Sequence, residues 1–515
     1  MSTSDYLLAL DNGTQSVRAL VFDLQGNLIA KSQEIFEAPH SPKKGWAEQD
    51  ANYFWIKLAY ACQHLWQQGI DPQSIKAVCV TTQRGSLVHV DEKGNPLRPM
   101  ILWMDQRQAC VRKPLGSYWG VLFKSIGLSS LVNYFRAQSE VNWVAQNQPE
   151  IMRKTHKVLL LSGLINYRLT GKFVESSANC VAYLPFDYKK QRWAAKGSWK
   201  WHAIALRPEQ LPDLLEVGTP LGEITEQASI QTGIPQGVPV IAGAADKACE
   251  VLGSGALEKN VACLSYGTTA TINTTREDYL EITRLIPPYP AAVAGRYNTE
   301  VMIYRGFWMV SWFKQEFGLQ ELQLAERLGL APEALFDDLV KQVPAGSEGL
   351  MLQPYWSPGL RVPGLEAKGA IIGFTDVHTR AHMYRAILEG IAYGLREGKE
   401  RIEKRSGTPI KCLKVSGGGS QSNAAMQLTA DIFGLPAERP HTFEASGLGA
   451  AIICAVALGY YPSYTAAVEA MVRVGDVFYP NPLAQTTYNQ LYRRVYLKMY
   501  KRLRALYKQI EKLPK

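Results

Sequence analysis

Three glycine-containing turns carry side chains that could hold a phosphate. They are DNGTQS at 11–16, GTT at 267–269 and GGGS at 417–420. Hydroxyl and amide groups on such turns form a concavity for phosphate oxygens, and a carboxylate beside it can hold a divalent ion. Tight turns and strand-to-helix crossings use the same residue types, so each turn alone is open to both interpretations.

Asp246 is a further candidate for chemistry. It follows the small-residue segment IAGAA at 241–245, which leaves a carboxylate room to project into a cleft. An Asp at this position can equally cap the helix expected after it. The local sequence therefore leaves two roles open, a reactive carboxylate or a helix cap.

Apolar periodicity predicts the elements that must position these residues. Strand-turn-strand patterns surround the first two turns, at 6–23 and 261–275, and strands and helices then alternate in the α/β manner. The other expected strands are 28–36, 75–81, 235–243 and 410–416, and the expected helices are 50–68, 381–399, 423–434 and 447–458. Both halves thus begin with a hairpin whose turn carries Gly-Thr, which suggests duplicated domains.

Composition and charge describe a globular protein with a basic tail. The 515 residues are enough for two or three domains, and 46% are hydrophobic and 20% charged. Residues 491–515 hold nine Lys or Arg and one Glu, so they carry eight of the ten net positive charges. Tyr492, Tyr496 and Tyr500 recur every four residues there, which predicts a docked amphipathic helix with a solvated basic face rather than a nucleic-acid or membrane contact.

The eight cysteines and the first residues favour a cytoplasmic protein. No CxxC pair occurs, which fits reduced thiols better than disulfides or zinc. The first residues, MSTSDYLLALDNG, show no secretory signal pattern. A GxxxxGK[ST] loop is also missing, so a P-loop nucleotide fold is set aside.

Eight ordered motifs together resemble the FGGY carbohydrate kinases. They are LALDNGTQSVRALVFD at 8–23, GWAEQD at 45–50, VTTQRGSL at 80–87, ILWMDQR at 101–107, AGAADKACEVLGSG at 242–255, LSYGTTA at 264–270, GAIIGFTDVHTRAHMYRAILEGIAY at 369–393 and VSGGGSQSNAAMQLTADIFGLP at 415–436. The resemblance implies an α/β protein with two actin-like, ribonuclease-H-like domains and a central interdomain cleft. Residues 1–247 would bind the sugar, and residues 248–515, ending in the basic helix, would bind ATP.

The resemblance also implies a role for individual residues. Asp246 would be the general base that accepts the proton of the sugar hydroxyl, and Asp11 would hold Mg²⁺ through water, with Asp246 as the second metal-site carboxylate. The implied ATP and phosphate contacts are Thr14, Gln15, Ser16, Arg18, Gly267, Thr268, Gly418, Gly419, Ser420 and Asn423. The implied substrate contacts are Arg84, Trp103, Asp105, Tyr134 and Lys247.

Three departures from the glycerol kinase pattern bear on the substrate. Gly85 stands where those enzymes have a Glu, Lys247 replaces an amide after the catalytic acid, and Glu140 takes a position commonly held by Lys. A missing carboxylate and an added cation open the pocket to a larger or acidic substrate. We therefore expect a kinase of a ketopentose such as xylulose or ribulose.

Two alternatives stay open, a glycerol or sugar-acid kinase and, from another class, an actin-like ATPase acting as a binding protein. The expected partner is a small-molecule sugar, without nucleic acid or membrane. A homodimer also stays open.

Overall fold

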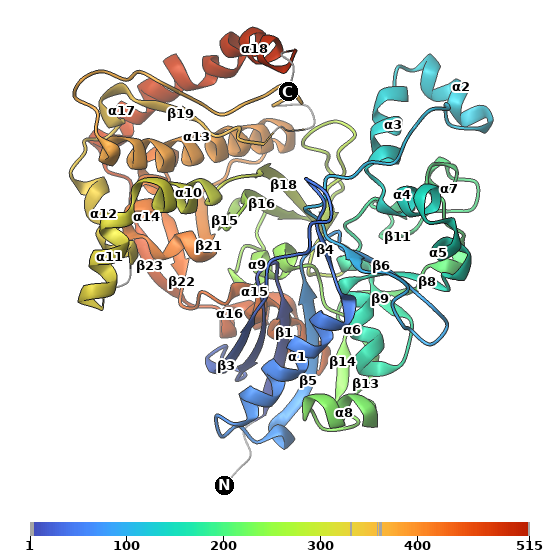
Figure 1. Ribbon diagram of the computed structural model, residues 1–515. Coiled ribbons are helices and arrows are strands. Elements are labelled where there is room, and N and C mark those ends of the chain that lie inside the picture. The colour runs from blue at the N-terminus through green and yellow to red at the C-terminus, as the bar shows by residue number, and fades with distance from the viewer. Residues whose placement is uncertain (1–4, 330–331, 358, 360–362, 513–515) are drawn as a thin grey trace. The chain divides into compact units, whose positions relative to one another are not determined.

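The computed structural model in Figure 1 describes residues 5–329, 332–357, 359 and 363–512. The chain forms two compact units. The first contains the chain up to Gly253 together with 289–297 and 446–472, and the second contains 254–288, 298–445 and the chain from Arg473. The division falls near the expected boundary after residue 247, but two later segments return to the first unit. The sequence-based domain limits stay a prediction.

The first unit is built on a six-stranded sheet in the order β13-β14-β5-β1-β2-β3. These strands are β13 (Pro220–Glu223), β14 (Pro239–Ile241), β5 (Ile75–Thr82), β1 (Tyr6–Asn12), β2 (Ser16–Phe22) and β3 (Leu28–Ile35). β14, β5 and β1 run parallel, whereas β2, β3 and β13 each run antiparallel to their neighbours. The carboxyl ends of the three parallel strands therefore meet at one edge of the sheet.

Helix α1 (Ala51–Trp66) shows how the sequence pattern builds this unit. Asp50 caps it by accepting a hydrogen bond from the Asn52 backbone N–H, and Phe54, Leu58 and Cys62 lie on its buried face, as the periodicity predicted. The other helices of the sheet layers are α6 (Leu161–Thr170), α8 (Glu226–Thr232), α9 (Asp246–Gly253), α15 (Ala445–Ala457) and α16 (Tyr464–Met471).

A smaller region of the first unit carries many aromatic side chains. Its four-stranded sheet has the order β4-β7-β6-β8, with β4 (Glu48–Gln49), β7 (Met100–Ile101), β6 (Leu87–Val90) and β8 (Lys157–Leu160). Its helices are α2 (Ser117–Ser125), α3 (Ser129–Gln138), α4 (Glu140–Asn147), α5 (Pro149–Lys154) and α7 (Trp199–Ala203). The Phe123 and Phe135 rings meet Trp199 edge-on, with centroids 5.4 and 5.3 Å away, which holds three of these helices together. Short two-stranded sheets pair β9 (Val174–Ser176) with β12 (Asp213–Leu215) and β10 (Phe186–Asp187) with β11 (Arg192–Trp193).

The second unit repeats the topology of the first. Its sheet contains the strand order β18-β16-β15-β21-β22-β23, with β15 parallel to β21, β21 parallel to β22, and antiparallel pairs β15–β16 and β22–β23. The strands are β18 (Tyr297–Ile303), β16 (Ala270–Arg276), β15 (Val261–Tyr266), β21 (Cys412–Ser416), β22 (Ala437–Pro440) and β23 (Val474–Phe478). This matches the order β3-β2-β1-β5-β14-β13 in the first unit and confirms the duplication that the two hairpins suggested.

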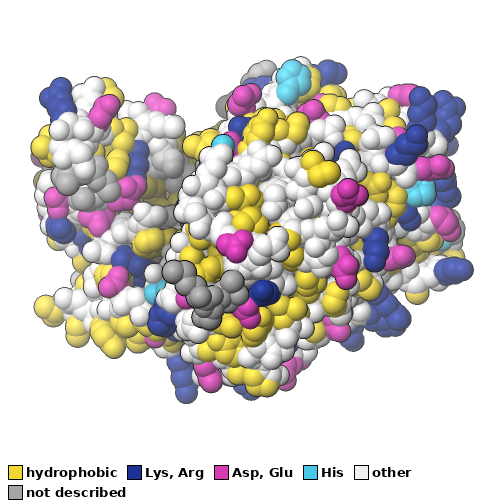
Figure 2. Space-filling view, turned by 90° about the horizontal axis from the view of Figure 1, so that it is seen from below, with side chains coloured by type: hydrophobic (Ala, Val, Ile, Leu, Met, Phe, Trp, Pro, Cys, Tyr) yellow, Lys and Arg dark blue, Asp and Glu magenta, His cyan; other side chains and the backbone are white. Residues whose placement is uncertain are grey.

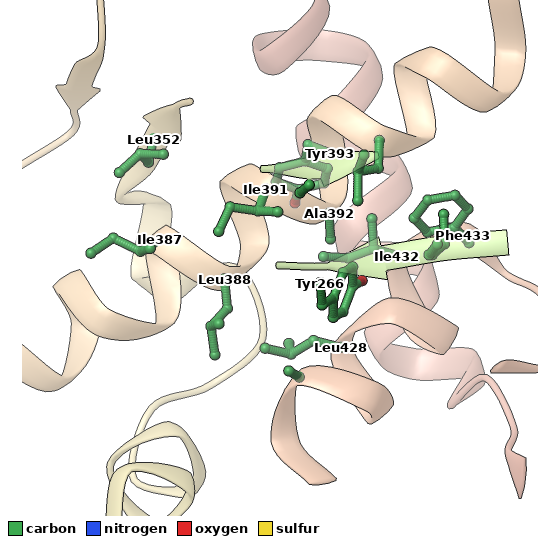
Figure 3. Packing of buried hydrophobic residues seen from close by; sticks show 14 of the residues in the cluster. Tyr266, Leu352, Ile387, Leu388, Ile391, Ala392, Tyr393, Leu428, Ile432 and Phe433 are labelled. Atoms are coloured by element: carbon green, nitrogen blue, oxygen red, sulfur yellow. The ribbon is translucent and has the colours of Figure 1, made fainter. Parts of the chain in front are cut away.

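Helices cover the second sheet and close its core. They are α10 (Trp308–Phe317), α11 (Leu319–Leu328), α12 (Pro332–Lys341), α13 (Arg380–Ser406), α14 (Asn423–Phe433), α17 (Pro482–Leu491) and α18 (Leu497–Glu511), and a small sheet pairs β19 (Met351–Gln353) with β20 (Ala370–Ile372). Figure 3 shows Ile391 and Ala392 of α13 gathered with Leu428 and Ile432 of α14 in one apolar cluster. The expected helices 381–399 and 423–434 are both found, the first longer than predicted.

The tail packs on the second unit by its tyrosines. A turn of π-helix at Tyr492–Tyr496 precedes α18, and both tyrosines are buried, with ring centroids 5.9 and 5.2 Å from that of Tyr393. The expected docked helix is therefore confirmed, with its basic residues mostly exposed. On the face drawn in Figure 2, basic and acidic side chains are interspersed.

Two features of the whole chain complete the description. None of the eight cysteines forms a disulfide. In the part of the chain that the structure describes, no helix has the length and apolar character needed to span a bilayer.

Candidate functional site

The carboxyl edge of the first sheet brings together the first turn and the segment before Asp246. Asp11 lies at the end of β1 beside Thr81 of β5, and the Thr81 hydroxyl donates a 2.8 Å hydrogen bond to the Ala244 carbonyl. β5 separates β1 from β14, so the backbones of those two strands lie about 10 Å apart. Asp11 lies at the end of β1, and Asp246 opens α9 after β14, so the two carboxylates come from segments on either side of β5.

Gly243 is required for this approach. A Cβ atom at this position would lie 2.2 Å from the Val80 carbonyl oxygen and 2.8 Å from the Cys79 sulfur, so any side chain would push the segment off β5. The chain then turns into α9 at Asp246, whose Oδ1 accepts a 2.7 Å hydrogen bond from the Lys247 backbone N–H. Asp246 therefore makes a local hydrogen bond at the start of the helix. This bond uses only one of its two carboxylate oxygens.

The surroundings of Asp246 suit a proton acceptor. Burial raises the pKa of the Asp246 carboxyl above its ordinary value, and the nearby charges of Lys247 and Arg84 oppose that rise without cancelling it. For Lys247, burial disfavours the charge, but Glu250, 2.9 Å from the ammonium, and Asp246 outweigh this and raise the pKa of Lys247. A carboxylate whose pKa lies above its ordinary value is a stronger proton acceptor, and the two cations favour its ionised form.

Asp11 is paired with the side chain predicted to approach the transferred phosphate. Arg18 faces Asp11 across the β1–β2 register, and its Nη2 lies 2.6 Å from Asp11 Oδ2. Asp11 is buried and Arg18 keeps about a quarter of its side chain exposed. The first turn itself is closed by a 3.0 Å hydrogen bond from the Gly13 N–H to the Ser16 carbonyl.

Asn12 was missed by sequence reasoning. Its side chain is fully buried between Asp11 and the turn, and neither its amide nitrogen nor its amide oxygen has a hydrogen-bond partner. Such a group costs on the order of 1 to 3 kcal/mol. Carboxylate oxygens are ligands that Mg²⁺ prefers, so Asp11 and Asp246 have the chemistry to hold a divalent ion through water. Asn12 follows Asp11 in β1, and successive side chains of a strand point to opposite faces, so its amide is not part of that pair.

The predicted substrate residues Trp103 and Arg84 border this edge. The Trp103 indole N–H donates to the Thr14 hydroxyl over 3.1 Å, and that hydroxyl lies 3.4 Å from the Gln83 amide oxygen. Gln83, which the prediction omitted, thus links the phosphate turn to the substrate residues. The Arg84 guanidinium carbon lies 5.1 Å from the centroid of the Tyr289 ring. Trp103 remains 37% exposed and so is available to a ligand.

Asp105 is placed differently from the other predicted substrate residues. Its buried carboxylate receives hydrogen bonds from the Arg107 backbone N–H, Nε and Nη2 and from the Ala47 N–H, at 2.6 to 2.8 Å. Arg107 in turn lies between the rings of Trp46 and Trp143, 3.9 and 4.6 Å from their centroids. Both oxygens of Asp105 are therefore engaged in a structural network, and its contact with substrate stays a prediction.

Tyr134 and Glu140 lie on the two helices next to this network. Burial raises the pKa of Tyr134, on α3, and a hydrogen bond with Tyr183 opposes the rise. Glu140 begins α4, where burial, with a smaller contribution from the charge of Asp105, raises the pKa of its carboxyl to about 8. Its Oε2 has no hydrogen-bond partner.

In the second unit the two remaining glycine turns meet around Phe307. The Phe307 and Trp308 N–H groups donate to the carbonyls of Gly267 and Thr268, at 3.1 and 3.3 Å. A Cβ atom at Gly419 would lie 2.3 Å from the Phe307 ring, whereas one at Gly418 would meet nothing within 4 Å. The structure thus brings 267–269 and 417–420 together, as a shared phosphate site requires.

Of the last two predicted nucleotide residues, Ser420 bonds within its own turn and Asn423 bonds to a residue farther along the chain. Ser420 is fully buried and its hydroxyl donates to the Gly417 carbonyl, while the Asn423 amide oxygen accepts from Arg439 over 2.7 Å. Asp337 accepts hydrogen bonds from the Ser422 hydroxyl and the Ala424 N–H, which fixes the start of α14. The local sequence could not predict that Arg439 and Asp337 contact α14, because both residues reach this helix only in the tertiary structure.

No denser metal centre competes with this assignment. Among the residues that the structure describes, no group of three or more His, Cys, Asp or Glu side chains gathers in a way that could hold a metal ion.

Two units with the same sheet order, each with a glycine-containing hairpin turn at the end of its first strand, define the actin-like, ribonuclease-H-like fold of this protein class. The chain belongs to the FGGY family of carbohydrate kinases, whose N-terminal domain matches residues 6–253 and whose C-terminal domain matches residues 262–458. It is an enzyme that transfers a phosphoryl group from ATP to a hydroxyl of a sugar or polyol.

Relatives of this chain carry different substrate names. It is 29% identical over 505 residues to a xylulose kinase of Lactococcus lactis, covering 96% of each chain. It is 30% identical over 484 residues to a glycerol kinase of Deinococcus radiodurans, covering 90% of this chain and 91% of that one. A crystal structure of a gluconate kinase from Lactobacillus acidophilus shares the fold, with a TM-score of 0.82, 22% identity and coverage of 98% and 100%.

Proposed function

We propose that this enzyme phosphorylates a ketopentose of the xylulose or ribulose type, with Asp246 as general base. The observation that carries the substrate class is Gly85. It has a φ of 77°, which side-chain-bearing residues rarely adopt, and a Cβ atom there would lie 3.6 Å from Trp103 Cβ. The space beside Trp103 that a Glu would occupy is thus left to the substrate, which favours a chain longer than three carbons.

In this reaction the Asp246 carboxylate accepts the proton of the attacking sugar hydroxyl. The hydroxyl oxygen forms a bond to the γ-phosphorus of ATP as the bond to the ADP oxygen breaks, and ADP leaves with the electron pair. Lys247 and Arg84 stabilise the ionised form of Asp246 against its burial, so that the carboxylate is available to take the proton. Arg18, partly exposed next to Asp11, would contact the transferred phosphoryl group.

We propose Mg²⁺ as the cofactor, held by Asp11 and Asp246 through water. When bound, it would neutralise the phosphate oxygens of the nucleotide. The turns at 267–269 and 417–420 would hold the nucleotide phosphates through their backbone N–H groups. Transfer requires that the γ-phosphate reach the sugar hydroxyl whose proton Asp246 accepts.

A sugar acid is the second candidate, because Arg84 and Lys247 place two cations near Asp246. The contact between Lys247 and Glu250 weighs against it, since an ammonium 2.9 Å from a carboxylate has less charge to offer a substrate carboxylate. A neutral ketopentose therefore remains the first choice, ahead of gluconate-like acids and of glycerol.

A substrate panel tests this order. ATP consumption would be measured with xylulose, ribulose, gluconate and glycerol, and we expect the highest kcat/KM with a pentulose. Gly85→Ala places a methyl group against Trp103 and should lower kcat/KM for the pentulose more than for glycerol. Glycerol or gluconate exceeding every pentulose would contradict the proposal.

We further propose that the enzyme acts in the cytoplasm. Its eight cysteines form no disulfide and six of them are buried, which suits a reducing compartment. The possible homodimer stays a prediction that light scattering after gel filtration would test.

A further inference from the structure

A cavity of about 500 Å³ lies in the first unit, and none of the predicted site residues lines it. Its walls come from α3, α4, α5, α7 and the residues that follow α7 up to Gln210. This volume is in the range of small-molecule sites. The cavity is therefore large enough for a ligand other than the sugar and nucleotide of the kinase reaction.

Three amide side chains hold the walls in place. The Asn142 amide donates to the carbonyls of Arg136 and Ala203 and accepts from the Ala205 N–H, and the Gln146 amide exchanges two hydrogen bonds with the backbone of Cys110. Gln210 donates to the Thr155 carbonyl. Because backbone groups occupy these amides, the cavity is formed before a ligand arrives.

The groups left to meet a ligand are basic. Arg136, Arg153, Arg207 and His202 line the cavity, and no Asp or Glu does. Arg136 bonds the Lys113 carbonyl and the Asn133 amide oxygen, both uncharged. Within the described ranges, none of the three arginines forms an ion pair, although Glu150 and Glu209 are close to Arg153 and Arg207 in sequence.

In the part of the chain that the structure describes, the positive charges of these three arginines are not balanced by ion pairs with carboxylates. Burial lowers the pKa of Arg136, which shows that its charge loses hydration without gaining a carboxylate. Guanidinium groups bind phosphate oxygens in pairs of parallel hydrogen bonds, and three of them around one cavity attract multiply charged anions far more than chloride. The Trp201 ring and Met152 add an apolar wall for the carbon part of a ligand.

We propose that this cavity is a second ligand site, which binds a small phosphorylated metabolite carrying at least two negative charges. The ligand would place its phosphoryl groups on Arg136, Arg153 and Arg207 and its carbon skeleton against Trp201. Binding here does not depend on which sugar the kinase phosphorylates, so the site can be tested without activity.

Cys110 offers a local readout, because it lines the cavity and is the one exposed cysteine of the eight. Inorganic pyrophosphate is the probe, and mass spectrometry follows the alkylation of Cys110 by uncharged iodoacetamide. We expect millimolar pyrophosphate to slow alkylation of Cys110 at least fivefold and to leave the half-buried Cys412 unaffected.

Two matched double variants each remove two positive charges. One pair of charges lines the cavity and the other pair lies outside it. Arg153→Gln with Arg207→Gln should abolish the protection, whereas Arg493→Gln with Arg502→Gln, both on the exposed basic tail, should keep it. Calorimetry gives a second measurement, in which the cavity variant binds one pyrophosphate fewer per chain than wild type. Equal protection in both variants, no protection of wild-type Cys110, or an unchanged stoichiometry would each overturn the proposal.

Discussion

Arg18 and Asp11 form an ion pair of 2.6 Å across the first hairpin, between two residues predicted for different partners, phosphate and metal. The guanidinium thus already neutralises the carboxylate before any substrate binds. A divalent ion at Asp11 must share or displace this contact. The hairpin would therefore couple the proposed metal site to the residue proposed to contact the transferred group.

Arg18→Gln should separate these two roles. We expect kcat to fall by about 10²-fold, because a cation facing the phosphoryl group is lost. The Mg²⁺ concentration for half-maximal activity should not rise, since a competing cation beside Asp11 is also lost. Arg276→Gln, which removes an ion pair with the mostly exposed Asp278, is the control and should change neither value. A higher Mg²⁺ requirement in Arg18→Gln would contradict this account.

Asp246→Asn should cut kcat by a factor of about 10² or more while ATP binding stays nearly intact. The amide keeps the size of the side chain and can still accept the Lys247 N–H, but it cannot take a proton. Single-turnover kinetics and equilibrium binding of ATP measure the two effects separately. Full turnover in this variant would show that Asp246 is not the base.

The pH profile should respond to Lys247 and Glu250 with opposite signs. A base works when deprotonated, so kcat/KM rises with pH through the pKa of Asp246. Lys247 lowers that pKa and Glu250 raises it. Lys247→Gln should therefore move the acid limb to higher pH, and Glu250→Gln should move it to lower pH. Shifts of the same sign in both variants would exclude Asp246 as the titrating group.

Glu140 should make the protein less stable as pH rises. Its pKa is raised from 4.5 to about 8 in the folded chain, so between these values the native state binds more protons than the unfolded state. The resulting stabilisation is complete below about pH 4.5 and is lost as pH rises through 8. Glu140→Gln should flatten this part of the stability curve and be the more stable protein at pH 8.5.

Urea unfolding of both proteins from pH 5 to 8.5 measures this difference. Glu175, a buried carboxyl with a pKa raised to about 7, is present in both and cancels in the comparison. Identical pH slopes for wild type and Glu140→Gln would contradict the prediction.

Replacement by alanine should affect stability very differently at Gly418 and at Gly419. The Gly419 methyl would lie 2.3 Å from Phe307, whose ring stacks on Tyr266 with centroids 4.5 Å apart and cannot easily move. Gly419→Ala should cost about 1 to 3 kcal/mol of unfolding free energy and weaken ATP binding. Gly418→Ala, with nothing within 4 Å, should change stability by less than about 0.5 kcal/mol. Equal losses in thermal and denaturant unfolding would contradict the packing argument.

Local patterns in the chain were enough to predict the hairpins, the glycine turns, helices such as α1 and α14, and the tyrosine face of the tail. Each depends on periodicities of two or 3.6 residues, or on turn residues that act within a few positions. The order of the motifs was enough to identify the family, and the role of Asp246 stays a prediction. The expected strand 235–243 is shorter than predicted, because only Pro239–Ile241 pairs with its neighbours.

Only the tertiary structure shows which of the predicted site residues have side chains available for chemistry. Asp105 lies in the motif ILWMDQR, yet its carboxylate oxygens accept hydrogen bonds from Arg107 and Ala47. Asn12 is an ordinary turn residue in sequence, yet its amide is buried without a partner, and three arginines far apart in the chain line one cavity. These outcomes depend on contacts between distant segments, and no local periodicity encodes which segments meet.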